Sequence, residues 1–224
     1  MPIARWSEWR NVPAGPAAPP VLGFVEPMLR RRLSSLAKIS LKVAHECAHD
    51  QPSVRFVYAS RHGDMTRTAG MLDALATGEP PSPTAFSLSV PNAAAGLFSI
   101  LRHDDAPATA ISAARSSFGF ALLEAAMQYA EDPGLPVLLV YADEPVPEVF
   151  GVGESEGNAL PHAVALLLSR HGATPPMAEI ACSMTPAVGC DDHGSHAMAF
   201  VESLSDGTAG AWCGEGRRWN WSVQ

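Results

Sequence analysis

Apolar residues recur along the chain at two spacings, and these predict alternating strands and helices. Between residues 27 and 49 they recur every three or four positions, the period of a helix that buries one face. Residues 137–142 (VLLVYA) are apolar throughout, which is typical of a strand buried on both faces. The same patterns predict strands at 54–60, 108–113, 163–168 and 177–182, helices at 66–76, 89–101 and 116–130, and a helix or strand at 197–204.

The two ends of the chain are rich in tryptophan. Trp6 and Trp9 precede a run of prolines that begins at Pro13, which predicts an extended arm pinned to the domain. Residues 211–221 hold three more tryptophans, which favours a packed strand. Because strands alternate with helices between these ends, we expect an α/β fold with a mostly parallel sheet.

Composition narrows the class of protein. Apolar residues make up 47% of the 224 residues and charged residues 17%, as in a globular domain with a sizeable core. The net charge of −8 argues against nucleic-acid binding, and we interpret the one dense basic run, residues 30–32, as a solvated helix face. Neither an apolar leader nor a membrane-length apolar run is visible, so we expect a cytoplasmic protein with four reduced cysteines.

One motif resembles a zinc site. His45-Glu46-Cys47-Ala48-His49 fits H-E-x-x-H, in which two histidines one helical turn apart hold zinc and the glutamate acts as a base. The two histidines share the polar side of the helix with Lys38 and Lys42, and nearby lysines disfavour a divalent cation. We therefore predict no metal, and keep a zinc-dependent hydrolase as an alternative function.

Two hydroxyl-bearing segments suggest other chemistry. Ser116 and Ser117 open a helix after a strand, although G-x-S-x-G is absent and an N-cap role suits Ser116. A stand-alone acyl transferase that uses Ser116 is a further alternative. Residues 191–196 (DDHGSH) gather metal-capable side chains, and we favour a solvated turn for them.

Residues 82–142 carry a resemblance to a known family. The stretch 87–100 reads SLSVPNAAAGLFSI, followed by Pro107 and then by ISAARSSF at 111–118. These segments resemble the P-S-x-I-x-N-M-x-A-G-H-x-x-I block, the turn proline and the I-x-T-A-C-x-S-G strand of β-ketoacyl synthases, which have the thiolase fold. Aligning Asn92 and Ala95-Gly96 needs no gap and puts Arg115 at the position of the nucleophilic cysteine.

The resemblance implies a chain without catalytic residues of its own. Arginine stays protonated and cannot replace the thiolate that takes the acyl group. The family's two histidine motifs, H-G-T-G-T and N-x-x-F-G-F-G-G-x-N, do not occur in this sequence. We expect Arg115 to fill the abandoned pocket or to pair with an acid, and we expect no cofactor.

A short, inactive synthase-like chain resembles the chain-length-factor subunits of aryl-polyene-type systems. The resemblance implies a heterodimer with an active ketosynthase, whose acyl tunnel this chain completes, and contact with an acyl carrier protein through that complex. The family's dimers join along the strand here at 108–113, and the gating residue falls on Val90. The expected tunnel and partner-interface residues are Val90, Pro91, Asn92, Ala93, Phe98, Thr109, Ile111 and Phe118.

The implied fold is a truncated thiolase-like α/β domain, roughly the N-terminal half of a β-ketoacyl synthase, with a mixed sheet and helices. We expect one domain, with an arm at 1–22, a thiolase-like core at 23–182 and a divergent tail at 183–224. Half of such a fold should leave a hydrophobic face uncovered, which predicts obligate pairing.

Overall fold

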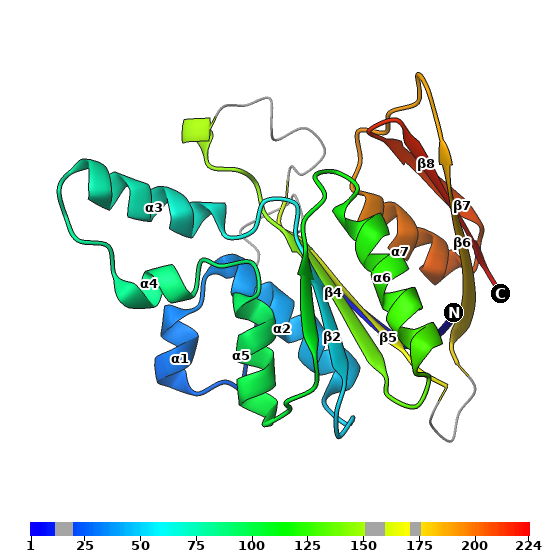
Figure 1. Ribbon diagram of the computed structural model, residues 1–224, viewed down its shortest axis with the longest axis horizontal. Coiled ribbons are helices and arrows are strands. Elements are labelled where there is room, and N and C mark those ends of the chain that lie inside the picture. Colours follow the sequence, from blue (N-terminus) through cyan, green and yellow to red (C-terminus); the bar gives the residue numbers. More distant parts are fainter. Residues whose placement is uncertain (12–19, 151–159, 171–175) are drawn as a thin grey trace.

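A computed structural model describes residues 1–11, 20–150, 160–170 and 176–224. The described strands form one sheet in the order β3-β2-β4-β5-β1-β6-β8-β7 (Figure 1). The strands are β1 (Pro2–Arg10), β2 (Arg55–Ala59), β3 (Ala108–Ile111), β4 (Val137–Asp143), β5 (His162–Leu168), β6 (Ala178–Pro186), β7 (Gly210–Gly214) and β8 (Arg217–Val223). The helices are α1 (Pro27–Arg32), α2 (Ser35–Ala48), α3 (Met65–Ala76), α4 (Pro83–Ser87), α5 (Ala93–Arg102), α6 (Ser117–Glu131) and α7 (His196–Asp206).

The sheet is mixed, as the family resemblance implies. Only β3, β2 and β4 run parallel, and every other neighbouring pair is antiparallel. The expectation of a mostly parallel sheet is therefore wrong. β7 and β8 are antiparallel because a tight turn joins them. Its residues Glu215 and Gly216 both have positive φ (56° and 72°), which is typical of two-residue hairpin turns.

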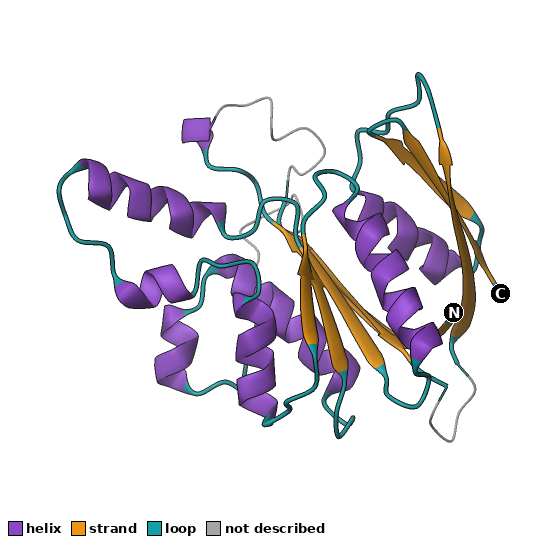
Figure 2. Ribbon diagram, in the orientation of Figure 1, coloured by secondary structure: helices purple, strands orange, loops and turns teal. Residues whose placement is uncertain are grey.

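The chain forms four layers, which Figure 2 shows most clearly. Helices α2 and α5 cover one face of the sheet. Helices α6 and α7 cover the other face, and the strands β6, β8 and β7 fold back over these two helices (Figure 1). The sheet can fold back because β1 and β6 pair only through Pro2 and Ile3, which leaves the rest of β6 free to diverge.

The C-terminal residues form part of the core on the side of the sheet that α6 and α7 cover. Trp212, Trp219 and Trp221 are 2%, 5% and 4% exposed and pack with Phe118 and Phe200 in the core between the two parts of the sheet. A buried aromatic side chain removes a large apolar area from water, so this segment stabilises the domain strongly. The expected divergent tail is therefore part of the core. The prediction of an uncovered hydrophobic face stays a prediction, because large apolar side chains on α3, α4, α5 and α6 remain exposed.

The N-terminal segment lies inside the sheet. β1 pairs along its length with β5, from Ile3 opposite Leu168 to Arg10 opposite His162. Ile3 is fully buried, whereas Trp6 and Trp9 pack against the two cores from opposite faces. The expected arm is thus a central strand, and the prolines at 13, 16 and 19 lie outside the described residues.

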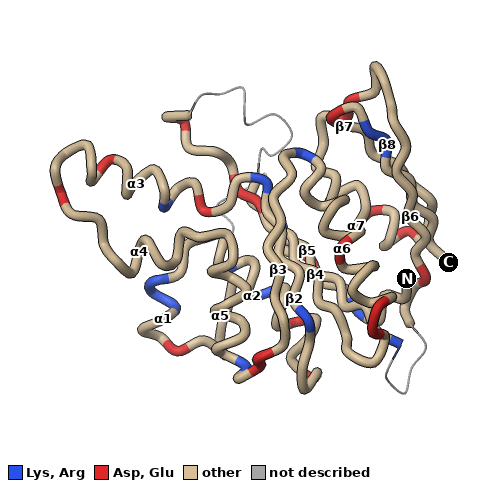
Figure 3. Tube along the Cα trace, in the orientation of Figure 1, with Lys and Arg blue, Asp and Glu red and all other residues tan. Residues whose placement is uncertain are grey.

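The helical stretch at 27–49 divides into two helices. Ser34 interrupts it, because its hydroxyl accepts a hydrogen bond from the Ala37 N–H (3.1 Å) and so caps α2. Arg31 and Arg32 are exposed at the end of α1, which confirms the solvated basic face (Figure 3). Within the described ranges, no helix has the length and apolar character needed to cross a bilayer.

Candidate functional site at the start of helix α6

A strand, a tight turn and a helix meet at Arg115, the residue that the family resemblance aligns with the nucleophilic cysteine. Ala114 has a left-handed backbone (φ 46°), which costs energy for a residue with a Cβ and is typical of functional turns. The Ser117 hydroxyl holds the turn, since it donates to the Ala114 carbonyl (2.6 Å) and accepts from the Ala113 N–H (2.9 Å). Together these contacts turn the backbone N–H groups of Arg115 and Ser116 outward at the start of α6.

A carboxylate from the far end of the chain occupies these N–H groups. Glu215, in the turn between β7 and β8, accepts from the Arg115 N–H (3.0 Å) and from the Ser116 N–H (3.2 Å) with its two oxygens. A helix N-terminus attracts anions through its free N–H groups and the helix dipole. Glu215 therefore fills the position where an anionic reaction centre would bind. The sequence analysis missed this residue, because 99 and 100 residues separate it from its partners.

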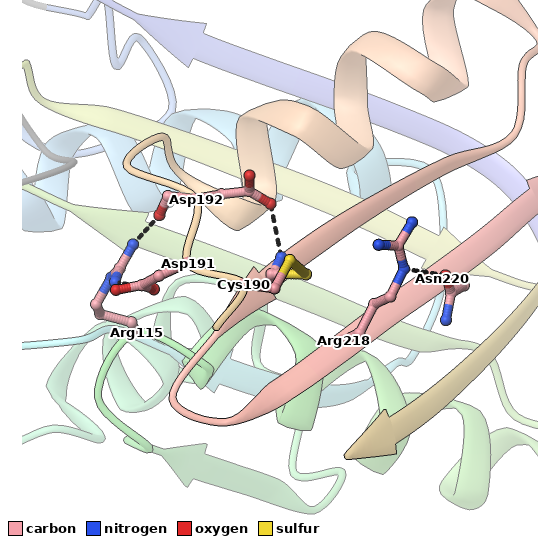
Figure 4. The surroundings of a disulfide bond; sticks show 7 residues. Arg115, Cys190, Asp191, Asp192, Arg218 and Asn220 are labelled. Atoms are coloured by element: carbon pink, nitrogen blue, oxygen red, sulfur yellow. Dashed lines mark hydrogen bonds and ion pairs between the residues drawn. A yellow bond between two sulfur atoms is a disulfide. The ribbon is translucent and has the colours of Figure 1, made fainter. Parts of the chain in front are cut away.

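The Arg115 side chain pairs with an acid, as expected. Its guanidinium donates to Asp191 (2.6 Å) and to the carbonyl of Asp192, and it lies 5.4 Å from the centre of the Trp212 ring. Figure 4 shows the guanidinium turned toward the acidic segment before α7. The turn thus presents a paired cation and a paired carboxylate, and no thiol.

A disulfide fixes the acidic segment. Cys190 and Cys213 are bonded, and the Cys213 N–H donates to the Asp192 carboxylate (2.7 Å; Figure 4). The prediction of four reduced cysteines is wrong for this pair, while Cys47 and Cys182 are free. The spacing of 23 residues gave no sign of the bond, because Cys190 and Cys213 meet only in the folded chain.

The structure brings part of the expected tunnel together. Val90, Pro91 and Ala93 line a hollow between α2 and α5 that has a volume of only about 20 Å³. Leu36 and Leu97 close its sides. Asn92 is exposed and precedes α5 without a side-chain cap. In the chain alone this hollow has room for about one water molecule.

The remaining expected interface residues divide between an edge and the core. Thr109 and Ile111 are half-buried on β3, which is the last strand of the sheet. Phe98 and Phe118 are 2% and 0% exposed and belong to the two opposite cores. The expectation of partner contact is corrected for these two, because their rings are already enclosed by this chain.

The two alternative sites have other contacts. Glu46 bonds Lys42 and the Ser7 hydroxyl, and His45 stacks on Phe24 (3.9 Å between ring centres). Among the described residues, no group of three or more histidine, cysteine or acidic side chains is placed to hold a metal. The Ser116 hydroxyl is buried without a hydrogen-bond partner, so no base contacts it.

Comparison with known proteins agrees with this geometry. The family model of the β-ketoacyl synthase N-terminal domain matches residues 6–222. The chain belongs to this family. No curated protein sequence matches it significantly.

Solved structures share the fold. A chain in the structure of the ketosynthase ApeO with its chain length factor ApeC, from Xenorhabdus doucetiae, is 25% identical, with 98% of each chain covered and a TM-score of 0.80. A β-ketoacyl synthase from Burkholderia phymatum is 15% identical with a TM-score of 0.61, and the match covers 76% of this chain and 52% of that one. An oxazolomycin ketosynthase domain from Streptomyces albus matches with a TM-score of 0.54 at 15% identity, over 80% of this chain and 38% of that one.

Proposed function

We propose that this chain is a non-catalytic, chain-length-factor-like subunit. It pairs with an active β-ketoacyl synthase and shapes that enzyme's acyl tunnel in polyene or fatty-acid-type biosynthesis. The observation that carries the proposal is the match over 98% of both chains within a complex of a ketosynthase and its chain length factor. A full synthase is matched over only 52% of its length, so the similar length favours the chain length factor as the counterpart.

The start of α6 supports a non-catalytic role. Acyl transfer in this family needs a thiolate at a helix N-terminus, where the dipole lowers the pKa of the thiol. Here the side chain at that point is the paired guanidinium of Arg115, and the N–H groups are bound to Glu215. A negative carboxylate at this place opposes the negative charge of a thiolate or an oxyanion.

The edge strand β3 supports pairing with a partner. Phe56 of β2 donates its N–H to the carbonyl of Pro107, and Ser60, directly after β2, donates to Ile111. Alternate residues of β3 therefore face β2. The backbone groups of Ala108 and Ala110 therefore point away from the sheet. Both residues are exposed, and an unpaired edge of this kind accepts a strand of another chain.

Apolar side chains flank this edge and continue beyond it. Ile100 of α5 and Met127 of α6 are 69% and 63% exposed, on the two helices that contact β3. Helices α3 and α4 project from the body (Figure 1) and bury none of their residues, although Leu72, Leu75 and Phe86 are apolar. These five exposed apolar side chains indicate a surface that another protein covers. Val90 and Pro91 lie next to α4, and we assign their hollow to the wall of the partner's acyl tunnel.

Co-expression and co-purification with an active ketosynthase from the same organism test the proposal. Ala110→Pro removes an outward N–H and no bond to β2, so the chain should fold and its affinity for the ketosynthase should fall at least about tenfold. Ala110→Ser keeps the N–H and should bind within about twofold of the wild type. A wild-type chain that stays a stable monomer and binds no ketosynthase would overturn the proposal, and equal binding by Ala110→Pro would overturn the role of β3.

A further inference from the structure

A polar cluster lies at the carboxyl ends of the parallel strands, outside the site already described. Asp143, the last residue of β4, is 1% exposed and accepts bonds from the Ser60 hydroxyl (2.8 Å), the Arg61 N–H (2.8 Å) and the Tyr141 hydroxyl. These three donors fix the position of the carboxylate. Ligands of open α/β sheets bind at this edge, because the loops that follow the strands meet there.

His162 lies beside this carboxylate with its tautomer fixed. It starts β5, directly opposite Asp143 in the sheet register, and it is 4% exposed. Its Nδ1 lies 3.1 Å from the Leu160 carbonyl oxygen. A carbonyl oxygen only accepts, so Nδ1 carries the proton and Nε2 of the neutral ring is an acceptor.

The free Nε2 accepts from Ser195. The two atoms are 2.9 Å apart, so the Ser195 hydroxyl directs its proton at the imidazole. Ser195 precedes α7 as its N-cap, yet its side chain makes no cap bond, unlike Ser34 before α2. The Ser195 hydroxyl thus bonds His162 instead of capping α7. Ser195 is half-buried, so reagents in solution can reach it, whereas Ser116 is fully buried.

This arrangement has the parts of an activated nucleophile. A hydroxyl lies within hydrogen-bond reach of a base, and a third group orients the base. We propose that Ser195 and His162 form a catalytic dyad that takes an acyl group from small acyl thioesters. This activity goes beyond the proposed function, in which the chain is non-catalytic for ketosynthase condensation, and it does not depend on that function.

The reaction balances with groups that the chain and solvent supply. Ser195 Oγ attacks the carbonyl carbon while its proton moves to His162 Nε2, the carbon–sulfur bond breaks, and the leaving thiol takes the proton back. Water then attacks the serine ester by the same path and releases the acid. Burial lowers the pKa of His162 and the nearby Asp143 partly offsets this, so the resting ring is a neutral base.

Acylation of the purified chain tests the dyad. The wild type, treated with p-nitrophenyl acetate and with the acetyl thioester of N-acetylcysteamine, should gain one acetyl group on the peptide that contains Ser195. Ser195→Ala should lose this label, and His162→Gln should lower the rate at least about a hundredfold. Ser183→Ala, an exposed serine of β6, is the matched control and should react as the wild type does.

A second readout keeps the test independent of folding defects. In Ser195→Cys, the thiol should react with iodoacetamide at least about tenfold faster when His162 is present than when it is glutamine. Acetylation at another residue, or equal rates for wild type and Ser195→Ala, would overturn the dyad. Binding to a ketosynthase is a separate measurement, so either proposal can fail alone.

Discussion

Arg115 and Asp191 form an ion pair, with Nη1 and Oδ1 2.6 Å apart, although 76 residues separate them in the sequence. The pair joins the start of α6 to the segment before α7. The disulfide of Cys190 fixes this segment, and the Glu215 carboxylate binds the start of α6. The start of α6 is therefore a structural junction between the N-terminal and C-terminal parts of this chain.

Loss of the Glu215 carboxylate should destabilise this junction. Glu215→Ala removes the acceptor of the Arg115 N–H, while the Ser116 N–H keeps its bond to the Ala113 carbonyl (3.0 Å). A lost N-terminal cap costs about 1 kcal/mol of unfolding free energy. Urea denaturation measures the difference. Glu202→Ala, at an exposed position on α7, is the control and should change the free energy by less than about 0.5 kcal/mol.

Restoring a cysteine should not restore condensation. In Arg115→Cys the thiol would lie beside the Glu215 carboxylate, and a neighbouring negative charge raises the pKa of a thiol. The double variant with Glu215→Ala also lacks the family's histidine motifs. Neither variant alone should form product from acyl and malonyl thioesters, as measured by mass spectrometry. Product above the wild-type background would contradict the non-catalytic assignment.

Stability should depend on pH through Glu144. Burial and then the nearby charge of Asp64 raise the pKa of this carboxyl from 4.5 to about 7. A raised pKa in the folded state favours the protonated form, so the stabilisation is complete below about pH 4.5 and is lost as the pH rises through about 7. The free energy of unfolding of Glu144→Gln should therefore be about 2–3 kcal/mol higher than that of the wild type at pH 8, and the two should be equal near pH 4.5.

Chemical denaturation across this pH range measures the effect. Glu148→Gln, at an exposed position, should leave the pH dependence unchanged. Equal pH slopes for the wild type and Glu144→Gln would show that Glu144 titrates normally.

Two helical glycines should respond oppositely to alanine. A Cβ on Gly119 of α6 would lie 2.7 Å from both His196 and Trp219, so Gly119→Ala should cost about 1–3 kcal/mol. A Cβ on Gly96 of α5 meets nothing within 4 Å, so Gly96→Ala should raise the free energy of unfolding by up to about 1 kcal/mol. Thermal unfolding of the two variants distinguishes the effects, and a stabilised Gly119→Ala would contradict the close packing of α6 against α7 and β8.

Reduction of the disulfide should lower stability. The bond closes a loop with a sequence separation of 23, for which the loss of chain entropy in the unfolded state is worth about 3 kcal/mol. A variant with both Cys190 and Cys213 replaced by serine should unfold at the same lower urea concentration with and without dithiothreitol. Cys182→Ser keeps the bond and should behave as the wild type does.

The local pattern of the sequence was sufficient to predict most of the strands and helices between residues 54 and 182. The apolar run at 137–142 and the periodic stretch at 116–130 became β4 and α6, because burial of one face or both faces leaves a mark within a few residues. The blocks around Asn92 and Arg115 also indicated the family. A short motif keeps its spacing in the sequence, so it can be recognised without the fold.

The tertiary structure alone decided which distant segments meet. The placement of β1 between β5 and β6, the covering of the core by Trp212 and Trp219, and the contact of Glu215 with α6 all join opposite ends of the chain. The bond between Ser195 and His162 is of the same kind. Such contacts depend on register and on packing between layers, and neither leaves a periodic signal in the residues that take part.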